Sequence, residues 1–168
     1  MARKPAPGRP RTAARVAAVQ ALFQSEQAGE TAEAVIDQFV RHRIGAMSGP
    51  DQPGFEEGRV PDAHVPLFTR IVRTAVNEQD RLDGMISGAL PPEWPMTRLD
   101  PVLRALLRAG GAELTMADGP PSRVVINEYL DVAHGFFTGE EPRMVNGLLD
   151  RLARELRPGD FGAPAASA

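Results

Sequence analysis

The sequence has no cysteine, few aromatic residues and no long hydrophobic run. The lack of cysteine excludes a disulfide scaffold, thiol catalysis and any cysteine-based zinc or iron–sulfur site. It also fits a reducing compartment, so we expect a cytoplasmic protein. No segment approaches the roughly 18 uninterrupted apolar residues of a membrane span, and we expect no contact with a membrane. Aromatic residues make up 5% of the chain, so the core must consist mainly of Leu, Val, Ile and Ala.

Motifs of catalytic and metal-binding proteins are also missing. The three histidines, His42, His64 and His134, are far apart and form no H-x-x-H or H-E-x-x-H pattern. The chain has no phosphate-binding loop, no G-x-S-x-G elbow and no nucleophile paired with a base. Asp80 and Asp83 are three residues apart and are interpreted as surface acids on a helix. We therefore predict a protein that is not an enzyme and has no cofactor and no metal site.

Charge is distributed unevenly along the chain. Residues 1–15 contain five basic residues and no acid, whereas the remaining chain has 14 basic and 22 acidic residues. The net charge of −3 thus combines about +5 at the head with about −8 elsewhere. A cationic arm on an acidic body indicates a binding site of limited size for a polyanion. The basic residues of this head are Arg3, Lys4, Arg9, Arg11 and Arg15.

Apolar spacing predicts an all-α bundle of six to seven helices with no convincing strand pair. We expect a single helical domain over residues 11–157, flanked by a disordered basic arm at 1–10 and a disordered tail at 158–168. Residues 45–61 contain four glycines and three prolines and are predicted to form a mobile loop. The expected helices span 12–28, 31–44, 62–90, 101–117, 122–137 and 142–156.

Several helix ends and one close packing contact are predicted from single residues. Asp100 followed by Pro101 is typical of an N-cap and first helical position. Ser122 is expected to cap the next helix, and residues 138–141 (TGEE) fit a capping box. Gly110 and Gly111 lie inside a helix, which predicts that a neighbouring helix approaches closely there.

Two further features bear on nucleic-acid binding. Arg11 and Arg15 are four residues apart, so they share one face of the first helix, and arginine forks suit phosphate groups. Phe136 and Phe137 could stack on unpaired bases. The alternative is a solvated arm and a phenylalanine pair that belongs to the core. Phe23 is assigned to the core.

Four segments together resemble the NusB family of bacterial transcription antitermination factors. The resemblance covers residues 11–157 without the 45–61 loop, and it implies two small packed helical subdomains. It also implies binding of boxA RNA together with the ribosomal protein NusE, in an antitermination complex with RNA polymerase that supports ribosomal RNA transcription. The segments are 14–24 (ARVAAVQALFQ), 98–101 (RLDP), 121–133 (PSRVVINEYLDVA) and 144–150 (MVNGLLD).

The resemblance also implies which residues contact RNA. The arginine-rich head of the family falls on Arg11 and Arg15, and more loosely on Arg9, Lys4 and Arg3. A second RNA-proximal cluster falls on Phe136, Glu140 and Arg143. The chain departs from the family pattern at Thr12 and Ala13, where the family has a denser basic cluster, and at Phe23, where it has tyrosine.

The helix that would face NusE matches the family less well. A family acid falls on Leu103 and a family tyrosine on Ala112. Glu113 matches, although it is also compatible with an ordinary surface acid. Two other functions stay open from the sequence. One is a diverged helical protein-interaction module without RNA binding, as a homodimer that buries the RNA face. The other is a module related to ribosomal RNA methyltransferases, which the lack of a nucleotide-binding domain disfavours.

Overall fold

The computed structural model describes residues 9–44 and 63–162, and these residues form helices and no strands. The all-α prediction is therefore confirmed for this part of the chain. The predicted 45–61 loop, Arg3 and Lys4 lie outside the described residues. Seven α-helices and two short 3-10 helices follow in the order α1 (Arg9–Ala28), α2 (Ala32–His42), α3 (Val65–Asn77), α4 (Gln79–Ala89), η2 (Met96–Arg98), α5 (Pro101–Leu114), α6 (Ser122–Phe136), α7 (Glu141–Leu156) and η3 (Pro158–Phe161).

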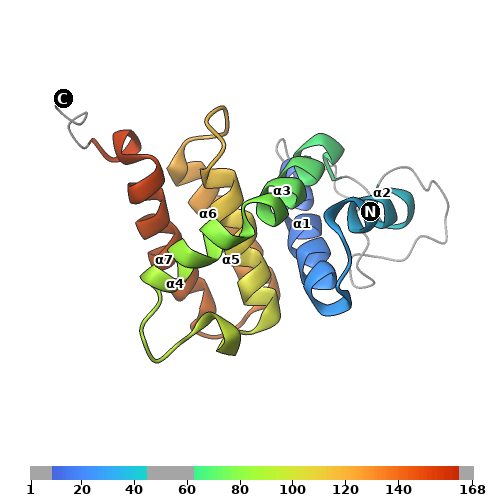
Figure 1. Ribbon diagram of the computed structural model, residues 1–168. Coiled ribbons are helices and arrows are strands. Elements are labelled where there is room, and N and C mark those ends of the chain that lie inside the picture. The colour runs from blue at the N-terminus through green and yellow to red at the C-terminus, as the bar shows by residue number, and fades with distance from the viewer. Residues whose placement is uncertain (1–8, 45–62, 163–168) are drawn as a thin grey trace.

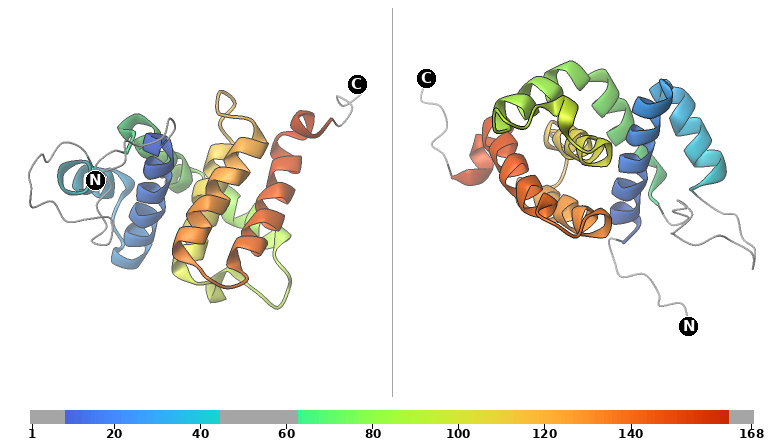
Figure 2. Two further views of the ribbon diagram at one scale, coloured as in Figure 1. Left: turned by 180° about the vertical axis from the view of Figure 1, so that it is seen from behind. Right: turned by 90° about the horizontal axis from the view of Figure 1, so that it is seen from below.

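The helices form two packed groups (Figure 1). One group contains α1, α2 and α3, and the other contains α4 to α7, as the views from behind and below also show (Figure 2). Helix α5 contacts α1 and α3 of the first group and α4, α6 and α7 of the second. It is therefore the element that both groups share, and all its residues from Ala105 to Leu114 are buried.

The glycine pair in α5 has the predicted effect. A Cβ atom on Gly110 would lie 3.0 Å from both terminal methyl groups of Leu149 on α7. A Cβ atom on Gly111 would lie 3.0 Å from Cδ2 of Leu82 on α4. The missing side chains thus let α7 and α4 approach α5, each at its own glycine.

The single helix expected over 62–90 is wrong, because the structure divides it at Glu78. This residue has φ −103° and ψ 15°, and it ends α3 and begins α4. Because of this break, the apolar residues before and after Glu78 pack against different helices. Helix α3 packs against α1, α2 and α5, whereas Leu82 and Ile86 belong to α4, which packs against α5 and α7.

The predicted cap is confirmed at α5, the caps predicted for α6 and α7 are wrong, and α1 begins earlier than expected. The Asp100 carboxylate accepts from the backbone N–H groups of Val102 (2.8 Å) and Leu103 (3.3 Å), as expected of an N-cap. Helix α1 begins at Arg9 instead of Thr12. The N-cap of α6 is Pro121, and the Ser122 hydroxyl donates instead to Asp160, 2.7 Å away in η3. No side chain caps α7, so residues 138–141 form no capping box.

Candidate nucleic-acid interface

The two arginines on which the sequence prediction concentrated lie in different environments. Arg11 is exposed near the start of α1, whereas Arg15, one turn further, is 2% exposed. The Arg15 guanidinium donates from Nε to Oε1 of Glu113 (2.6 Å) and from Nη2 to Oε2 (3.0 Å). This two-point contact joins α1 to the centre of α5.

Glu113 is fully buried, so the interpretation as a surface acid is wrong. Its Oε1 also accepts a hydrogen bond from the Tyr129 hydroxyl (2.8 Å) of α6. Glu128 of α6 lies 3.2 Å from Nη1 of Arg15 and accepts from the Thr12 hydroxyl (2.8 Å). Three helices therefore meet in one buried polar network.

The charges in this network stabilise one another. Burial acts to lower the pKa of Arg15, but the hydrogen bond and the negative charge of Glu113 outweigh it, so the pKa is raised. Burial, followed by the nearby Glu113 carboxylate, raises the pKa of Tyr129 well above its ordinary value, so Tyr129 stays neutral. Arg15 is buried and paired with Glu113, so the structure does not expose its guanidinium for the phosphate contact that the sequence predicts.

Phe136 lines a pocket of about 460 Å³, which we call the α1–α6 pocket. Helix α1 supplies most of its wall, including Phe23, and both phenylalanine rings are half-buried. The Oε1 atom of Gln20 is buried and has no hydrogen-bond partner among the described residues. The full lining is Val19, Gln20, Phe23, Gln24, Gln27, Ala28, Arg43, Val102 and Phe136.

A cation stands at the wall of the α1–α6 pocket. Arg43 follows α2, and its Cζ atom lies 4.4 Å from the centre of the Phe39 ring. Among the described residues, no carboxylate comes within 4.0 Å of its side-chain nitrogens. Arg43 therefore brings a positive charge to the pocket that these residues do not neutralise by an ion pair.

The structure does not bring Glu140 and Arg143 into the pocket of Phe136. Both line a second pocket of about 590 Å³, between the segment before α5 and the start of α7. Trp94 lines it as well and is 49% exposed. The cluster predicted from Phe136, Glu140 and Arg143 is thus divided between two neighbouring pockets.

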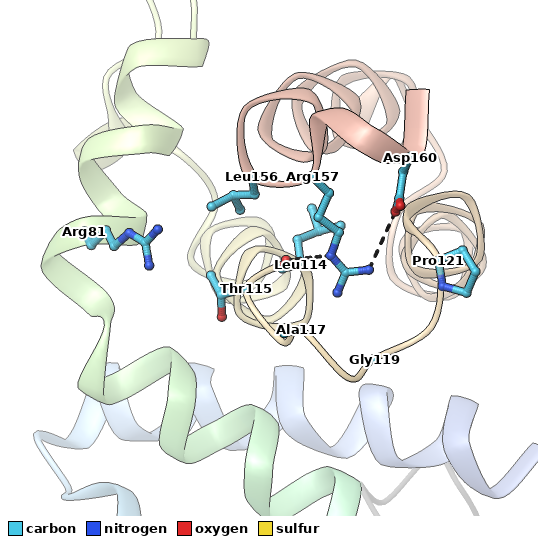
Figure 3. A pocket seen from close by; sticks show the side chains of 9 residues that line it. All are labelled: Arg81, Leu114, Thr115, Ala117, Gly119, Pro121, Leu156, Arg157 and Asp160. Carbon is cyan, nitrogen blue, oxygen red and sulfur yellow. Dashed lines mark hydrogen bonds and ion pairs between the residues drawn. The ribbon is translucent and has the colours of Figure 1, made fainter. Parts of the chain in front are cut away.

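A third pocket, of about 490 Å³, is lined by an arginine whose hydrogen bonds go to the protein's own backbone (Figure 3). Arg157 points into it and donates to the backbone carbonyl oxygens of Leu114 (2.9 Å), Glu113 (3.0 Å) and Met116 (2.6 Å). The last carbonyls of a helix lack partners within the helix, so Arg157 caps the end of α5. The Arg157 guanidinium therefore stabilises the fold through these hydrogen bonds.

Gln20, Phe23 and Arg43 are absent from the site that the sequence predicts; Phe23, which the sequence assigns to the core, is half-buried and packs against the core. Gln20 and Phe23 are three residues apart on α1, a spacing that places them on one face and was available from the sequence. Arg43 carried no such signal, because its place beside α1 depends on how α2 folds back.

Within residues 9–44 and 63–162, no three His, Asp or Glu side chains gather closely enough to hold a metal ion. Among the described helices, none combines the length and the apolar character that crossing a bilayer requires.

Comparisons with known proteins identify the family. The NusB family model matches residues 12–154. Transcription antitermination protein NusB of Granulibacter bethesdensis is 72% identical over 153 residues, covering 91% of this chain and 93% of that protein. The protein of the same name from Gluconobacter oxydans is 55% identical over 152 residues, covering 90% and 91%.

Solved structures agree with the fold. T. maritima NusB superposes with a TM-score of 0.69 at 26% identity, covering 91% of this chain and 97% of that one. A complex described as antitermination factors NusB and NusE with dsRNA contains a chain with a TM-score of 0.67 at 23% identity, covering 88% and 98%. The relatives are named as antitermination proteins, which confirms the prediction of a protein that is not an enzyme. The chain belongs to the NusB family of transcription antitermination proteins.

Proposed function

We propose that this protein binds boxA RNA together with NusE and acts in the cytoplasm, in an antitermination complex with RNA polymerase that supports ribosomal RNA transcription. One observation carries the proposal. An exposed cation, Arg11, and an aromatic pocket containing Phe23 and Phe136 lie along the same helix. Cations hold phosphates and aromatic faces stack on unpaired bases, so the two features suit single-stranded RNA. The fold shared with a chain of the NusB–NusE–dsRNA complex supports it.

The two features are separated by a distance that one strand can span. Phe23 follows Arg11 by twelve positions, which corresponds to about 18 Å along an α-helix. Helix α6 follows the same direction, because Glu128 meets Thr12 and Phe136 meets the pocket two turns later. A strand that lies along α1 and α6 therefore reaches both the cation and the aromatic rings.

Each predicted residue except the buried Arg15 has a proposed role on this path. Arg11, with Arg9, Lys4 and Arg3 before it, binds phosphates. Phe136 stacks on a base. In the neighbouring pocket, Arg143 binds a phosphate, and Glu140 accepts from a base amino group or restrains affinity by repelling phosphate.

The test is a titration of boxA-like RNA with the full chain, with and without NusE, at two salt concentrations. Binding that NusE strengthens, that falls with salt and that depends on the RNA sequence supports the proposal. A protein without RNA binding in any condition supports the helical interaction module instead, and light scattering then shows whether it is a homodimer.

Arg11 provides the matched variant. Arg11→Ala is expected to weaken binding to all RNA sequences alike and to reduce the slope of log affinity against log salt by about 1. Arg151→Ala removes an exposed arginine from α7 and serves as the control. An unchanged slope in Arg11→Ala would remove Arg11 from the RNA site.

A further inference from the structure

The second pocket, which we call the α5–α7 pocket, has an exposed tryptophan in its wall. Its volume is about 590 Å³, and Trp94 is the one aromatic side chain among the described residues that is exposed. Tryptophan usually hides most of its surface, and a flat ring at a pocket wall offers a stacking surface for a nucleobase. Leu103 and Met144 add apolar wall. The pocket is therefore of a size and character that suit one nucleotide.

The segment that carries Trp94 is held against α5. Nη1 of Arg104 donates to the carbonyl oxygens of Met96 (2.8 Å) and Leu99 (3.2 Å), which follow Trp94 in the chain. The backbone N–H of Trp94 donates to the carbonyl oxygen of Pro91 (2.9 Å), which closes a turn. The tryptophan is thus placed at the pocket wall before any ligand binds, and such preorganisation lowers the cost of binding.

Two cations at this pocket are not neutralised. Arg98 ends η2 and Arg143 lies in the first turn of α7, and both side chains are exposed and line the pocket. Neither guanidinium makes a hydrogen bond or an ion pair with the described residues. A guanidinium matches the charge and the geometry of a phosphate, so each can bind one.

One carboxylate of the lining is also unused. Asp100 accepts from the N–H groups that begin α5, and Glu141 is half-buried with its Oε2 atom shielded from solvent. Glu140 is exposed, and its carboxylate makes no hydrogen bond or ion pair with the described residues. The α5–α7 pocket therefore combines a stacking ring, two unpaired cations and one unpaired two-oxygen acceptor.

We propose that the α5–α7 pocket binds one unpaired guanine nucleotide of the RNA. Trp94 stacks on the base, and the Glu140 carboxylate accepts from its N1–H and from its N2 amino group. Arg98 and Arg143 bind the adjoining phosphates. This assignment rests on the proposed RNA binding, to which it adds the identity of one base and two residues, Trp94 and Arg98.

The carboxylate decides the choice of base. Stacking holds any base, because every base has a π-face, so a polar group must supply the selectivity. The Watson–Crick edge of guanine presents two adjacent N–H donors, which match the two oxygens of a carboxylate. Adenine and cytosine place an acceptor beside the amino group on that edge, and uracil places its N–H between two carbonyl oxygens. Each of these acceptors would face the negative charge of Glu140.

The experiment measures the binding of boxA-like RNA to the full chain with NusE present. Guanosine is placed at each RNA position in turn. Inosine, which lacks only the N2 amino group, then replaces it at the position where guanosine binds most tightly. We expect inosine to weaken binding about tenfold there, the low end for a hydrogen bond to a charged group, since the pocket is open to solvent.

In Glu140→Ala this tenfold ratio should disappear. The ratio is the readout because loss of a negative charge also reduces the repulsion of phosphates in general. Glu93→Ala is the matched control: it removes an exposed carboxylate one residue from Trp94 that does not line the pocket, and it should keep the ratio. Trp94→Leu should weaken the guanosine and inosine RNAs alike by about tenfold or more. All three changes affect exposed side chains, so thermal unfolding should remain close to that of the parent.

The outcomes separate the pocket from the proposed function. A tenfold ratio that persists in Glu140→Ala overturns the pocket assignment, as does RNA binding that nowhere prefers guanosine to inosine. Unchanged affinity in Trp94→Leu overturns it as well. In these three cases the proposed RNA binding stands. A parent protein that binds no RNA overturns the proposed function together with the pocket.

Discussion

At the scale of residues, two arginines four positions apart on α1 lie in different environments. Arg11 faces solvent, whereas Arg15 is enclosed by Glu113, Glu128 and Tyr129 from two other helices. The positive head therefore consists of charges available to a ligand and a charge that the fold neutralises. Sequence counts of basic residues do not distinguish these two kinds.

This difference leads to a prediction about stability. Arg15→Ala leaves the Glu113 carboxylate buried without its cation, and loss of one partner of a buried ion pair costs about 3–5 kcal/mol. Arg11→Ala changes an exposed side chain, and we expect an effect within about 0.5 kcal/mol. Urea unfolding of both variants measures the two free energies. Equal stabilities would show that the Arg15 contact does not hold α1 on α5.

At the scale of elements, a second charged cluster connects α1 to α5. Glu26, in the last turns of α1, forms ion pairs with Arg104 and with Arg108 of α5. Arg108 also contacts Asp83 of α4, with Nε 2.8 Å from Oδ1. The two clusters, at Arg15 and at Glu26, attach opposite halves of α1 to α5.

The Glu26 cluster predicts the behaviour of the protein in acid. The hydrogen bond from Arg104 is the largest cause that lowers the pKa of Glu26. A carboxyl whose pKa is lowered in the folded state stabilises that state fully at pH values above its ordinary pKa of about 4.5. This stabilisation is lost as the pH falls through the lowered pKa.

Glu26→Gln is therefore expected to be less stable than the parent at neutral pH, and the difference should shrink below about pH 4.5. Urea unfolding from pH 7 to pH 3 measures it. Glu155→Gln on α7, where the carboxylate lies 4.0 Å from Arg151 at the surface, is the control and should change little. A difference that is constant with pH would exclude the Glu26 ion pairs as its source.

The glycines of α5 and α7 give a matched pair of substitutions. Gly147→Ala, on the exposed side of α7 with no atom within 4 Å of the new Cβ, should stabilise by about 0.5–1 kcal/mol. Gly110→Ala gains the same propensity but forces Leu149 out of its packing, which costs about 1–3 kcal/mol. The net change is an expected loss of up to about 2 kcal/mol. Thermal unfolding that ranks Gly110→Ala above Gly147→Ala would contradict the close approach.

At the scale of the whole molecule, the sequence predicted helices better than contacts between them. The N-cap at Asp100 and the close packing at the glycine pair depend on the identity of single residues, so a sequence pattern can predict them. The break at Glu78 has no glycine or proline to mark it, and apolar spacing continues through it. The burial of Arg15 depends on Glu113, which is 98 residues away, and such a partner cannot be derived from local patterns.

In the candidate site, too, local sequence does not predict which side chains lie together. Phe136 and Arg143 are seven residues apart in sequence, and the turn before α7 places them in different pockets. Phe136 instead lines the α1–α6 pocket together with Phe23 and Arg43. The family resemblance identified the region, and the arrangement of helices decides which side chains act together.

The position of α5 predicts how the described part of the chain unfolds. Both helical groups pack on α5, and the Arg15 and Glu26 clusters bind α1 to it, so the two groups should not open separately. We expect amides at 17–22 in α1 and at 105–112 in α5 to exchange hydrogen with the same opening free energy, equal to that of global unfolding. Hydrogen exchange in increasing denaturant measures both sets. A lower opening free energy for α1 would mean that the α1–α3 group unfolds first, and that the shared helix does not make the two groups one cooperative unit.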